Sequence, residues 1–191
     1  MDFSFLSPVQ DRLVDQIELL HGQAIGKKLS VHSSKGTPEL EGVKIAIVGV
    51  LESRNSVDHI GEEFQLNEIR KAFYKLFPGN WLHGMADLGD IQKGASVEDT
   101  YFALIEVVSS LVKANIIPLI IGGSQDLTYA NYRAYDKISS MVNIVNIDKS
   151  FDLGDSSKPI NNGSYLGKII LEQPYNLFNY TVIGFQTYFN S

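Results

Sequence analysis

The most constraining feature of this chain is a regular alternation of short apolar runs with longer amphipathic segments. Residues 43–50 read VKIAIVGV, a β-branched run of the kind found in strands that are covered on both faces. Further strands are predicted at 81–88, 116–121, 142–147 and 181–186, and helices at 8–22, 67–77, 96–114, 126–138 and 166–171. Strands that alternate with helices need right-handed crossover connections, which predicts an α/β fold with a mostly parallel sheet.

The helix predicted at 96–114 has a recognisable start. Ser96 is a suitable N-cap, and Asp99 occupies the third helical position, which is a variant of the capping box. Leu104, Val107 and Leu111 recur at three- and four-residue spacing and predict the face that packs on the sheet.

The composition excludes several classes of function. A net charge of -6 and a pI near 5.2 argue against a nucleic-acid backbone as partner, because phosphate binding needs clustered Lys and Arg. Cysteine is absent, which excludes disulfides, zinc–thiolate sites and a cysteine nucleophile. The N-terminus lacks the charged and apolar regions of a signal peptide, and no apolar run reaches the length of a membrane span. We therefore expect a cytoplasmic protein that binds neither nucleic acid nor membranes.

Polar segments follow four of the predicted strands. They lie at 52–55, 87–90, 124–126 and 148–155. In an open parallel sheet the ligand crevice lies beyond the carboxyl ends of the strands, so these four corners are expected to converge on one site. The topology locates that site without naming its chemistry.

Taken in order, these segments resemble motifs of the ureohydrolase superfamily, which contains arginase, agmatinase and formimidoylglutamase. GGSQD at 122–126 stands where the family has G-G-D-H-S, and DKSFD at 148–152 stands where it has D-A-H-x-D. NGS at 162–164 matches the family's H-G-T or H-G-S. The supporting context is DLGD at 87–90, which is similar to an L-G-D turn, and a helix-opening segment at 61–70 that ends in I-R. The resemblance is closest to the formimidoylglutamase-like branch.

The resemblance implies a three-layer α/β/α fold that holds two manganese ions at the strand ends. In the family, a hydroxide bridging the two ions attacks a linear amidine such as N-formimino-glutamate. We expect residues 1–40 to form an N-terminal helix and loop, and residues 41–191 to form the N-terminal part of an arginase-like domain. The family's last metal motif, S-x-D-x-D, is missing, so we expect the chain to be part of a longer protein whose sheet is incomplete here. Family members often form homo-oligomers.

The metal corners depart from the family pattern. Asp148 and Asp152 are retained, but Gln125 and Ser150 stand where the family has imidazoles. A neutral amide oxygen and an undissociated hydroxyl are poorer ligands for a transition ion than imidazole. The sequence therefore predicts a lost or altered metal site, with either no cofactor or a weakly bound divalent cation, manganese or magnesium.

Two further departures bear on catalysis. Asn162 stands at the family's substrate-side histidine and cannot shuttle a proton near neutral pH. Lys149 places a cation beside the two aspartates, where it opposes a divalent ion or replaces its charge. The chain's histidines lie outside these corners; they are His21, His32, His59 and His83.

Simpler interpretations stay open for several of these residues. Ser124 and Asp126 would cap the helix that follows them, and Arg70 would form a structural ion pair. Asp148 and Asp152 would belong to a solvated turn. Two functions also stay open. The first is a hydrolase of a linear amidine that uses a hard ion held by Asp148, Asp152 and Gln125. The second is an inactive family member that works as a binding, regulatory or scaffolding subunit.

Overall fold

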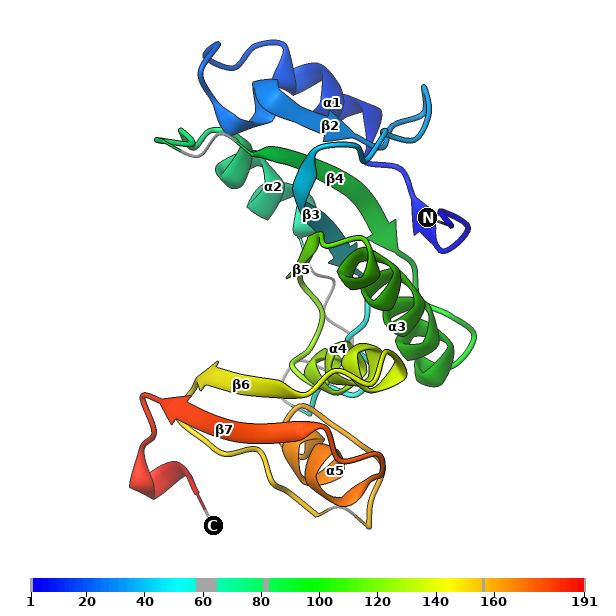
Figure 1. The fold of residues 1–191 in the computed structure, drawn as a ribbon. Coiled ribbons are helices and arrows are strands. Elements are labelled where there is room, and N and C mark those ends of the chain that lie inside the picture. Colours follow the sequence, from blue (N-terminus) through cyan, green and yellow to red (C-terminus); the bar gives the residue numbers. More distant parts are fainter. Residues whose placement is uncertain (1, 58–64, 81–82, 156, 191) are drawn as a thin grey trace.

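A computed structural model describes residues 2–57, 65–80, 83–155 and 157–190 (Figure 1). Its helices are α1 (Asp11–Ile17), α2 (Leu66–Tyr74), α3 (Val97–Lys113), α4 (Leu127–Lys137) and α5 (Tyr165–Leu171), with 3-10 turns η1 (Ile25–Lys28) and η2 (Thr187–Phe189). Its strands are β1 (Leu6–Ser7), β2 (Leu29–Val31), β3 (Val43–Val50), β4 (Gly84–Ile91), β5 (Ile117–Ile121), β6 (Val142–Ile147) and β7 (Leu177–Ile183). No helix in this part of the chain is long and apolar enough to span a membrane.

The strands form two separate sheets. In the larger sheet the order is β1-β4-β3-β5, with β2 also pairing with β4, and every pairing except that of β1 is parallel. The smaller sheet contains β6 and β7, which also run parallel to each other. The predicted α/β fold with a mostly parallel sheet is therefore confirmed, and Figure 1 shows the two sheets lying apart.

Helices cover both faces of the larger sheet. Ala46, Val48 and Val50 point from β3 into a core built with α3 and α4. Ile47 points to the opposite face, into a cluster that includes residues of α1 and α2. This alternation is the period-two pattern of a strand buried on both faces, and it produces the expected three-layer arrangement.

The start of α3 is as predicted. The Ser96 side chain accepts a hydrogen bond from the Asp99 backbone N–H, and the Asp99 carboxylate accepts one from the Ser96 backbone N–H. Leu104, Val107 and Leu111 are buried in the core below. The capping box and the apolar stripe therefore fix both the beginning and the orientation of this helix.

Several predicted boundaries are wrong. The first helix ends at Ile17, and Leu19, inside the predicted span, is 86% exposed. The last strand runs from Leu177 to Ile183, earlier than predicted, and ends before Gly184, which has a positive φ of 93°. The sequence reading also missed β1 and β2, which are too short to show a periodic pattern. His59, residues 61–64 of the predicted helix-opening segment and residues 81–82 of the predicted strand lie outside the described residues.

The 87–90 segment is inside β4 and not at a corner beyond it. Arg70 is fully buried and donates from Nε to Asp87 and from Nη1 to Asp90, both at 2.8 Å. The predicted structural ion pair of Arg70 is thus confirmed. Gly89, with φ at 84°, allows β1 to pair closely with β4, because a Cβ there would lie 1.9 Å from the Ser7 carbonyl oxygen. Of the four expected corners, this one is a buried structural element.

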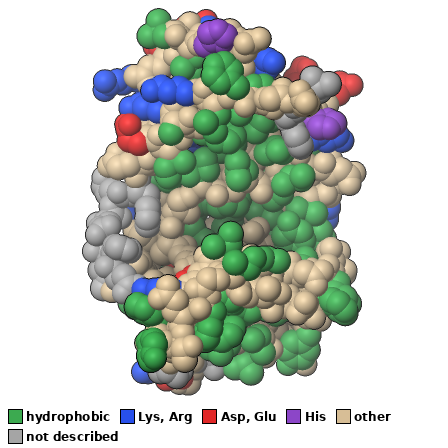
Figure 2. All heavy atoms as spheres, turned by 90° about the vertical axis from the view of Figure 1, so that its left-hand side faces the viewer, with side chains coloured by type: hydrophobic (Ala, Val, Ile, Leu, Met, Phe, Trp, Pro, Cys, Tyr) green, Lys and Arg blue, Asp and Glu red, His purple; other side chains and the backbone are tan. Residues whose placement is uncertain are grey.

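One face of the molecule is hollowed. Figure 2 views the side of the molecule that lies at the left in Figure 1, and hydrophobic side chains gather there around a hollow. The exposed apolar residues of the sheets include Ile117 of β5, Val145 and Ile147 of β6, and Ile183 of β7.

Candidate functional site

The structure brings three of the predicted corners together, because the Ser124 backbone N–H donates to the Glu52 carbonyl oxygen at 2.9 Å. The segment after β5 and the segment after β6 meet at a cavity of about 370 Å³. All the sequence-predicted site residues line this cavity: Gln125, Asp148, Lys149, Ser150, Asp152 and Asn162. The convergence expected from parallel strands therefore holds for these corners.

Asp148 is held by neutral hydrogen-bond donors. Its Oδ2 accepts from the Gln125 amide nitrogen at 2.6 Å, and its Oδ1 accepts from the backbone N–H groups of Lys149 at 2.6 Å and Ser150 at 3.3 Å. Burial opposes ionisation of this carboxyl, but these donors outweigh burial and hold its pKa below the ordinary value. Neutral donors thus favour the ionised form of Asp148.

The orientation of Gln125 follows from its neighbours. An ionised carboxylate only accepts hydrogen bonds, so the Gln125 group 2.6 Å from Asp148 Oδ2 must be the NH2 and not the carbonyl oxygen. The same nitrogen lies 3.3 Å from the Tyr165 hydroxyl. The amide therefore presents a donor to Asp148, in the place where an imidazole ligand is expected from the family pattern.

Only one of the two carboxylate oxygens of Asp152 has a hydrogen-bond partner among the described residues. The Ser150 hydroxyl donates to its Oδ1 at 2.6 Å, while its Oδ2 is buried and has no hydrogen-bond partner among the described residues. Burial raises the pKa of this carboxyl. Its backbone has a positive φ of 54°, and its carbonyl oxygen accepts from the backbone N–H of Leu166. The residue is thus anchored by the start of α5.

Lys149 and Asn162 line the cavity in different ways. The Lys149 ammonium lies 4.4 Å from the centre of the Phe189 ring. Asn162 accepts a hydrogen bond at its Oδ1 from the Val57 backbone N–H at 2.9 Å. That bond ties the loop after β3 to the segment that leads into α5.

Comparison with known proteins identifies the fold's relatives. Residues 43–191 match the Arginase family. This chain belongs to the arginase family. It is 29% identical over 136 residues to the formimidoylglutamase of Hahella chejuensis, covering 65% of this chain and 41% of that protein. It is 28% identical over 165 residues to the formimidoylglutamase of Streptococcus gordonii, covering 80% of this chain and 50% of that protein.

Solved structures show the same architecture. A formiminoglutamase from Trypanosoma cruzi with Mn²⁺ superposes with a TM-score of 0.66 at 19% identity, covering 80% of this chain and 56% of that one. The formimidoylglutamase of Bacillus subtilis gives a TM-score of 0.67 at 19% identity, covering 78% and 50%. The arginase-family chain thus sits in the formimidoylglutamase-like branch and spans about half the length of the relatives it matches.

The described residues of this corner lack the imidazoles of the family pattern. None of the described residues that line the cavity is a histidine. Across the described residues, no group of three or more His, Cys, Asp or Glu side chains is placed to hold a metal ion. The two retained aspartates accept hydrogen bonds from Gln125 and Ser150, so the positions of the two expected imidazoles are filled by donors to these carboxylates.

The capping role expected for Ser124 and Asp126 is wrong. Asp126 stands at the N-terminus of α4 but makes no side-chain cap hydrogen bond. Its carboxylate is fully buried and accepts instead from the hydroxyls of Tyr101 and Ser124. Tyr101 belongs to α3, so Asp126 joins the two helices and does not cap one of them.

The sequence analysis placed Glu52 in the corner at 52–55 but missed its role as a buried structural acid. Glu52 follows β3 and is fully buried; it accepts from the Arg54 guanidinium at 2.6 Å and from the Thr100 hydroxyl at 2.8 Å. Arg54 in turn donates to the backbone carbonyls of Gly94, Ala95 and Ser96. The pair therefore fastens the loop before α3 to the end of β3. The sequence signal that could have indicated this role is an acidic residue shortly after an apolar strand.

Acid is expected to destabilise the fold through Glu52. Burial opposes its ionisation, but hydrogen bonds from Arg54 and Thr100 lower its pKa from 4.5 to about 2. Because the folded pKa lies below the unfolded one, this stabilisation is complete above pH 4.5 and is lost as the pH falls toward 2. Urea unfolding between pH 2 and 6 should show the loss, and Glu52→Gln should be less stable at pH 6 and flatten the curve below pH 4.5. An unchanged slope in that variant would contradict this role.

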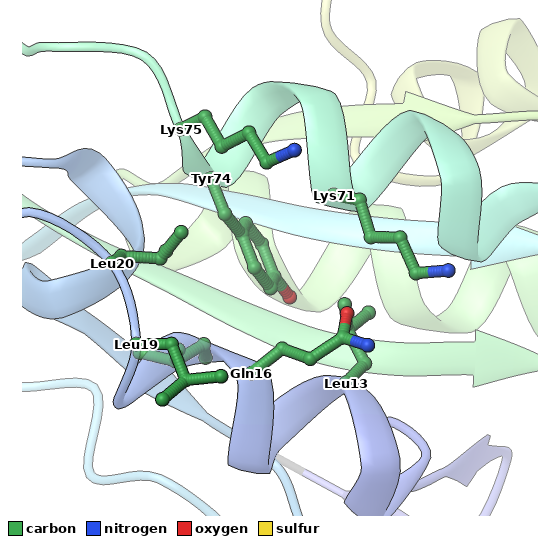
Figure 3. A pocket seen from close by; sticks show the side chains of 8 residues that line it. Leu13, Gln16, Leu19, Leu20, Lys71, Tyr74 and Lys75 are labelled. Atoms are coloured by element: carbon green, nitrogen blue, oxygen red, sulfur yellow. The ribbon is translucent and has the colours of Figure 1, made fainter.

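Another cavity lies away from this site. It has a volume of about 460 Å³ between α1 and α2, and Leu13, Ile17 and Tyr74 lie along it with Lys71 and Lys75 (Figure 3). None of the predicted site residues lines it.

Proposed function

We propose that this arginase-family chain does not form the dinuclear manganese centre and acts as a non-hydrolysing binding or scaffolding subunit. The observation that supports this most is the 2.6 Å hydrogen bond from the Gln125 amide nitrogen to Asp148. A metal ligand must present a lone pair to the ion, but this nitrogen has none to offer. The Gln125 amide therefore takes the place of a metal ligand and stabilises the Asp148 carboxylate through a hydrogen bond.

The cost of reversing this arrangement argues against metal binding. Turning the Gln125 amide oxygen toward an ion would break the hydrogen bonds to Asp148 and Tyr165 and would supply only a neutral oxygen. Ser150 would likewise have to leave Asp152. Manganese binds more weakly than most first-row divalent ions, so a site with two carboxylates and no imidazole has little affinity to offset those losses.

One observation favours the alternative, an amidine hydrolase that uses a hard ion. Asp152 Oδ2 is buried without a partner among the described residues, and Asp148 lines the same cavity. Carboxylate oxygens are the preferred ligands of Mg²⁺ and Mn²⁺. Under this alternative, Asp148, Asp152 and a reoriented Gln125 would hold the ion, and Asn162 would face a small amidine substrate.

Metal content and activity separate the two readings. We expect the purified chain, incubated with Mn²⁺ or Mg²⁺ and desalted, to retain only substoichiometric metal by mass spectrometry and to leave N-formimino-glutamate unhydrolysed. The formimidoylglutamase of Bacillus subtilis, treated identically, serves as the positive control. Stoichiometric metal in the chain would support the hydrolase and contradict the proposal.

A further inference from the structure

The cavity between α1 and α2 has the size and the lining of a ligand site. Its volume of about 460 Å³ lies within the range of about 300–1,000 Å³ that is usual for small-molecule pockets. Leu13, Ile17 and Leu20 supply apolar walls, and the buried ring of Tyr74 lies between the two helices (Figure 3). Most of the lining is therefore apolar, as it is in ligand pockets generally.

The walls of this cavity are fixed by the packing of η1. The backbone N–H of Ile25 donates to the Leu76 carbonyl oxygen at 2.7 Å, which fastens η1 to the end of α2. A Cβ at Gly26 would lie 2.7 Å from the Leu20 side chain and 2.9 Å from the Tyr74 Cβ. Only glycine lets the backbone approach these two side chains so closely, so the cavity is a preformed part of the fold.

The charges on the lining of the cavity are positive. Among the described residues that line it, Lys71 and Lys75 carry ammonium groups, and none carries a carboxylate. Gln16 adds an amide from α1. Figure 3 shows Leu19 and Leu20 at one end of the cavity and the Lys71 ammonium at the other. This lining is complementary to a ligand that has an apolar body and one anionic group.

The polar groups around the cavity differ in what they can offer a ligand. The Tyr74 hydroxyl donates to Asp87 at 2.7 Å, so Tyr74 contributes its ring and not its hydroxyl. Lys71 pairs with Glu68 at 2.5 Å, but the Glu68 side chain is 63% exposed, and exposed pairs of this kind contribute little. A carboxylate in the cavity can therefore compete with Glu68 for the Lys71 ammonium.

We propose that the cavity between α1 and α2 binds a small aliphatic carboxylate. The hydrocarbon chain of this ligand lies against Leu13, Leu20 and the Tyr74 ring. Its carboxylate accepts hydrogen bonds from the ammonium groups of Lys71 and Lys75. The inference goes beyond the proposed function, because this cavity and the corner that contains Asp148 share none of their described lining residues.

Calorimetric titration of the full chain with a series of ligands tests the inference. We expect octanoate to bind with a Kd of about 1 mM or tighter, given its small number of atoms. Each methylene added between hexanoate and decanoate should tighten binding by about threefold to fourfold. Octylamine has the same chain and the opposite charge, so it should not bind. No octanoate binding at about ten times that Kd, or equal binding of octylamine, would overturn the proposal.

NMR spectra of the methyl-labelled chain locate the bound octanoate. The methyl resonances of Ile17 and Leu20 should shift on titration, because both side chains line the cavity. Those of Ile117 and Ile147, which are exposed apolar residues on β5 and β6, should stay unchanged. Shifts confined to Ile117 and Ile147 would show non-specific binding to the exposed sheet and would overturn the proposal.

Matched variants test the two lysines. Lys71→Gln with Lys75→Gln should weaken octanoate binding by at least about tenfold, because both donors to the carboxylate lose their charge. Lys44→Gln with Lys113→Gln changes the net charge equally at exposed positions outside the cavity and should leave binding unchanged. Normal binding in the first variant would overturn the proposal. If that variant also melted at a lower temperature, the two lysines would only stabilise the C-terminal end of α2.

Discussion

Replacing Arg70 with alanine is expected to lower the free energy of unfolding by about 3–5 kcal/mol, because it leaves two acids without their cation. The Arg70 side chain is fully buried between Asp87, whose side chain is also fully buried, and Asp90, whose side chain is 14% exposed. It also donates to the Gly89 carbonyl at 3.1 Å, and the Tyr74 hydroxyl donates to Asp87 at 2.7 Å. The loss would thus spread through a connected network, and urea unfolding followed by circular dichroism measures it.

A neighbouring ion pair supplies the control. Lys71 is next in sequence and pairs with Glu68 at 2.5 Å on the exposed side of α2. Lys71→Ala removes the same charge and should cost no more than about 0.5 kcal/mol, since exposed helix pairs contribute little. A failure of Arg70→Ala to fold agrees with the expected loss, given that domains of this size have only about 5–15 kcal/mol in total. A loss below about 1 kcal/mol, or equal losses in both variants, would contradict this account of the network.

The double variant Gln125→His with Ser150→His is expected to bind Mn²⁺ at least about 100-fold more tightly than the natural chain, since losing even an outer-shell partner costs 10–100-fold. Both side chains line one cavity with Asp148 and Asp152, so the change would add two imidazoles beside two carboxylates. It would also remove the two side chains that now donate hydrogen bonds to those carboxylates. Isothermal titration with Mn²⁺ measures the difference.

The control variant replaces one glutamine and one serine with histidine at positions outside the cavity. Gln23→His with Ser157→His adds two histidines at exposed positions and should leave Mn²⁺ affinity unchanged. Lys149 bears on the outcome, because a cation held against the aspartates would block the gain. It lies instead over the Phe189 ring, so the gain is expected. If the double variant binds no better than the control, the corner has been reshaped beyond the loss of its imidazoles.

The elements that were predicted well depend on local patterns. The bounds of β3 and β6 follow from β-branched runs, and the start of α3 follows from a capping box made by residues three apart. These signals need only a short window of sequence. The meeting of the segments after β5 and β6 was also predictable, because it follows from the parallel topology.

What the sequence did not show depends on residues far apart in the chain. Arg70 stands 17 residues before Asp87, so nothing local indicated that the 87–90 segment would be buried within β4. Asp126 resembled a helix cap, but Tyr101 of another helix takes its carboxylate. The division into two sheets is equally non-local, since strand pairing cannot be read from either strand alone.

The central claim is that Gln125 and Ser150 prevent metal binding by Asp148 and Asp152. A crystal grown with excess Mn²⁺ and measured at the manganese absorption edge tests it most directly. We predict no anomalous peak between Asp148 and Asp152, with the Gln125 amide still hydrogen-bonded to Asp148. Two peaks about 3.5–4 Å apart, bridged by these carboxylates, would contradict it.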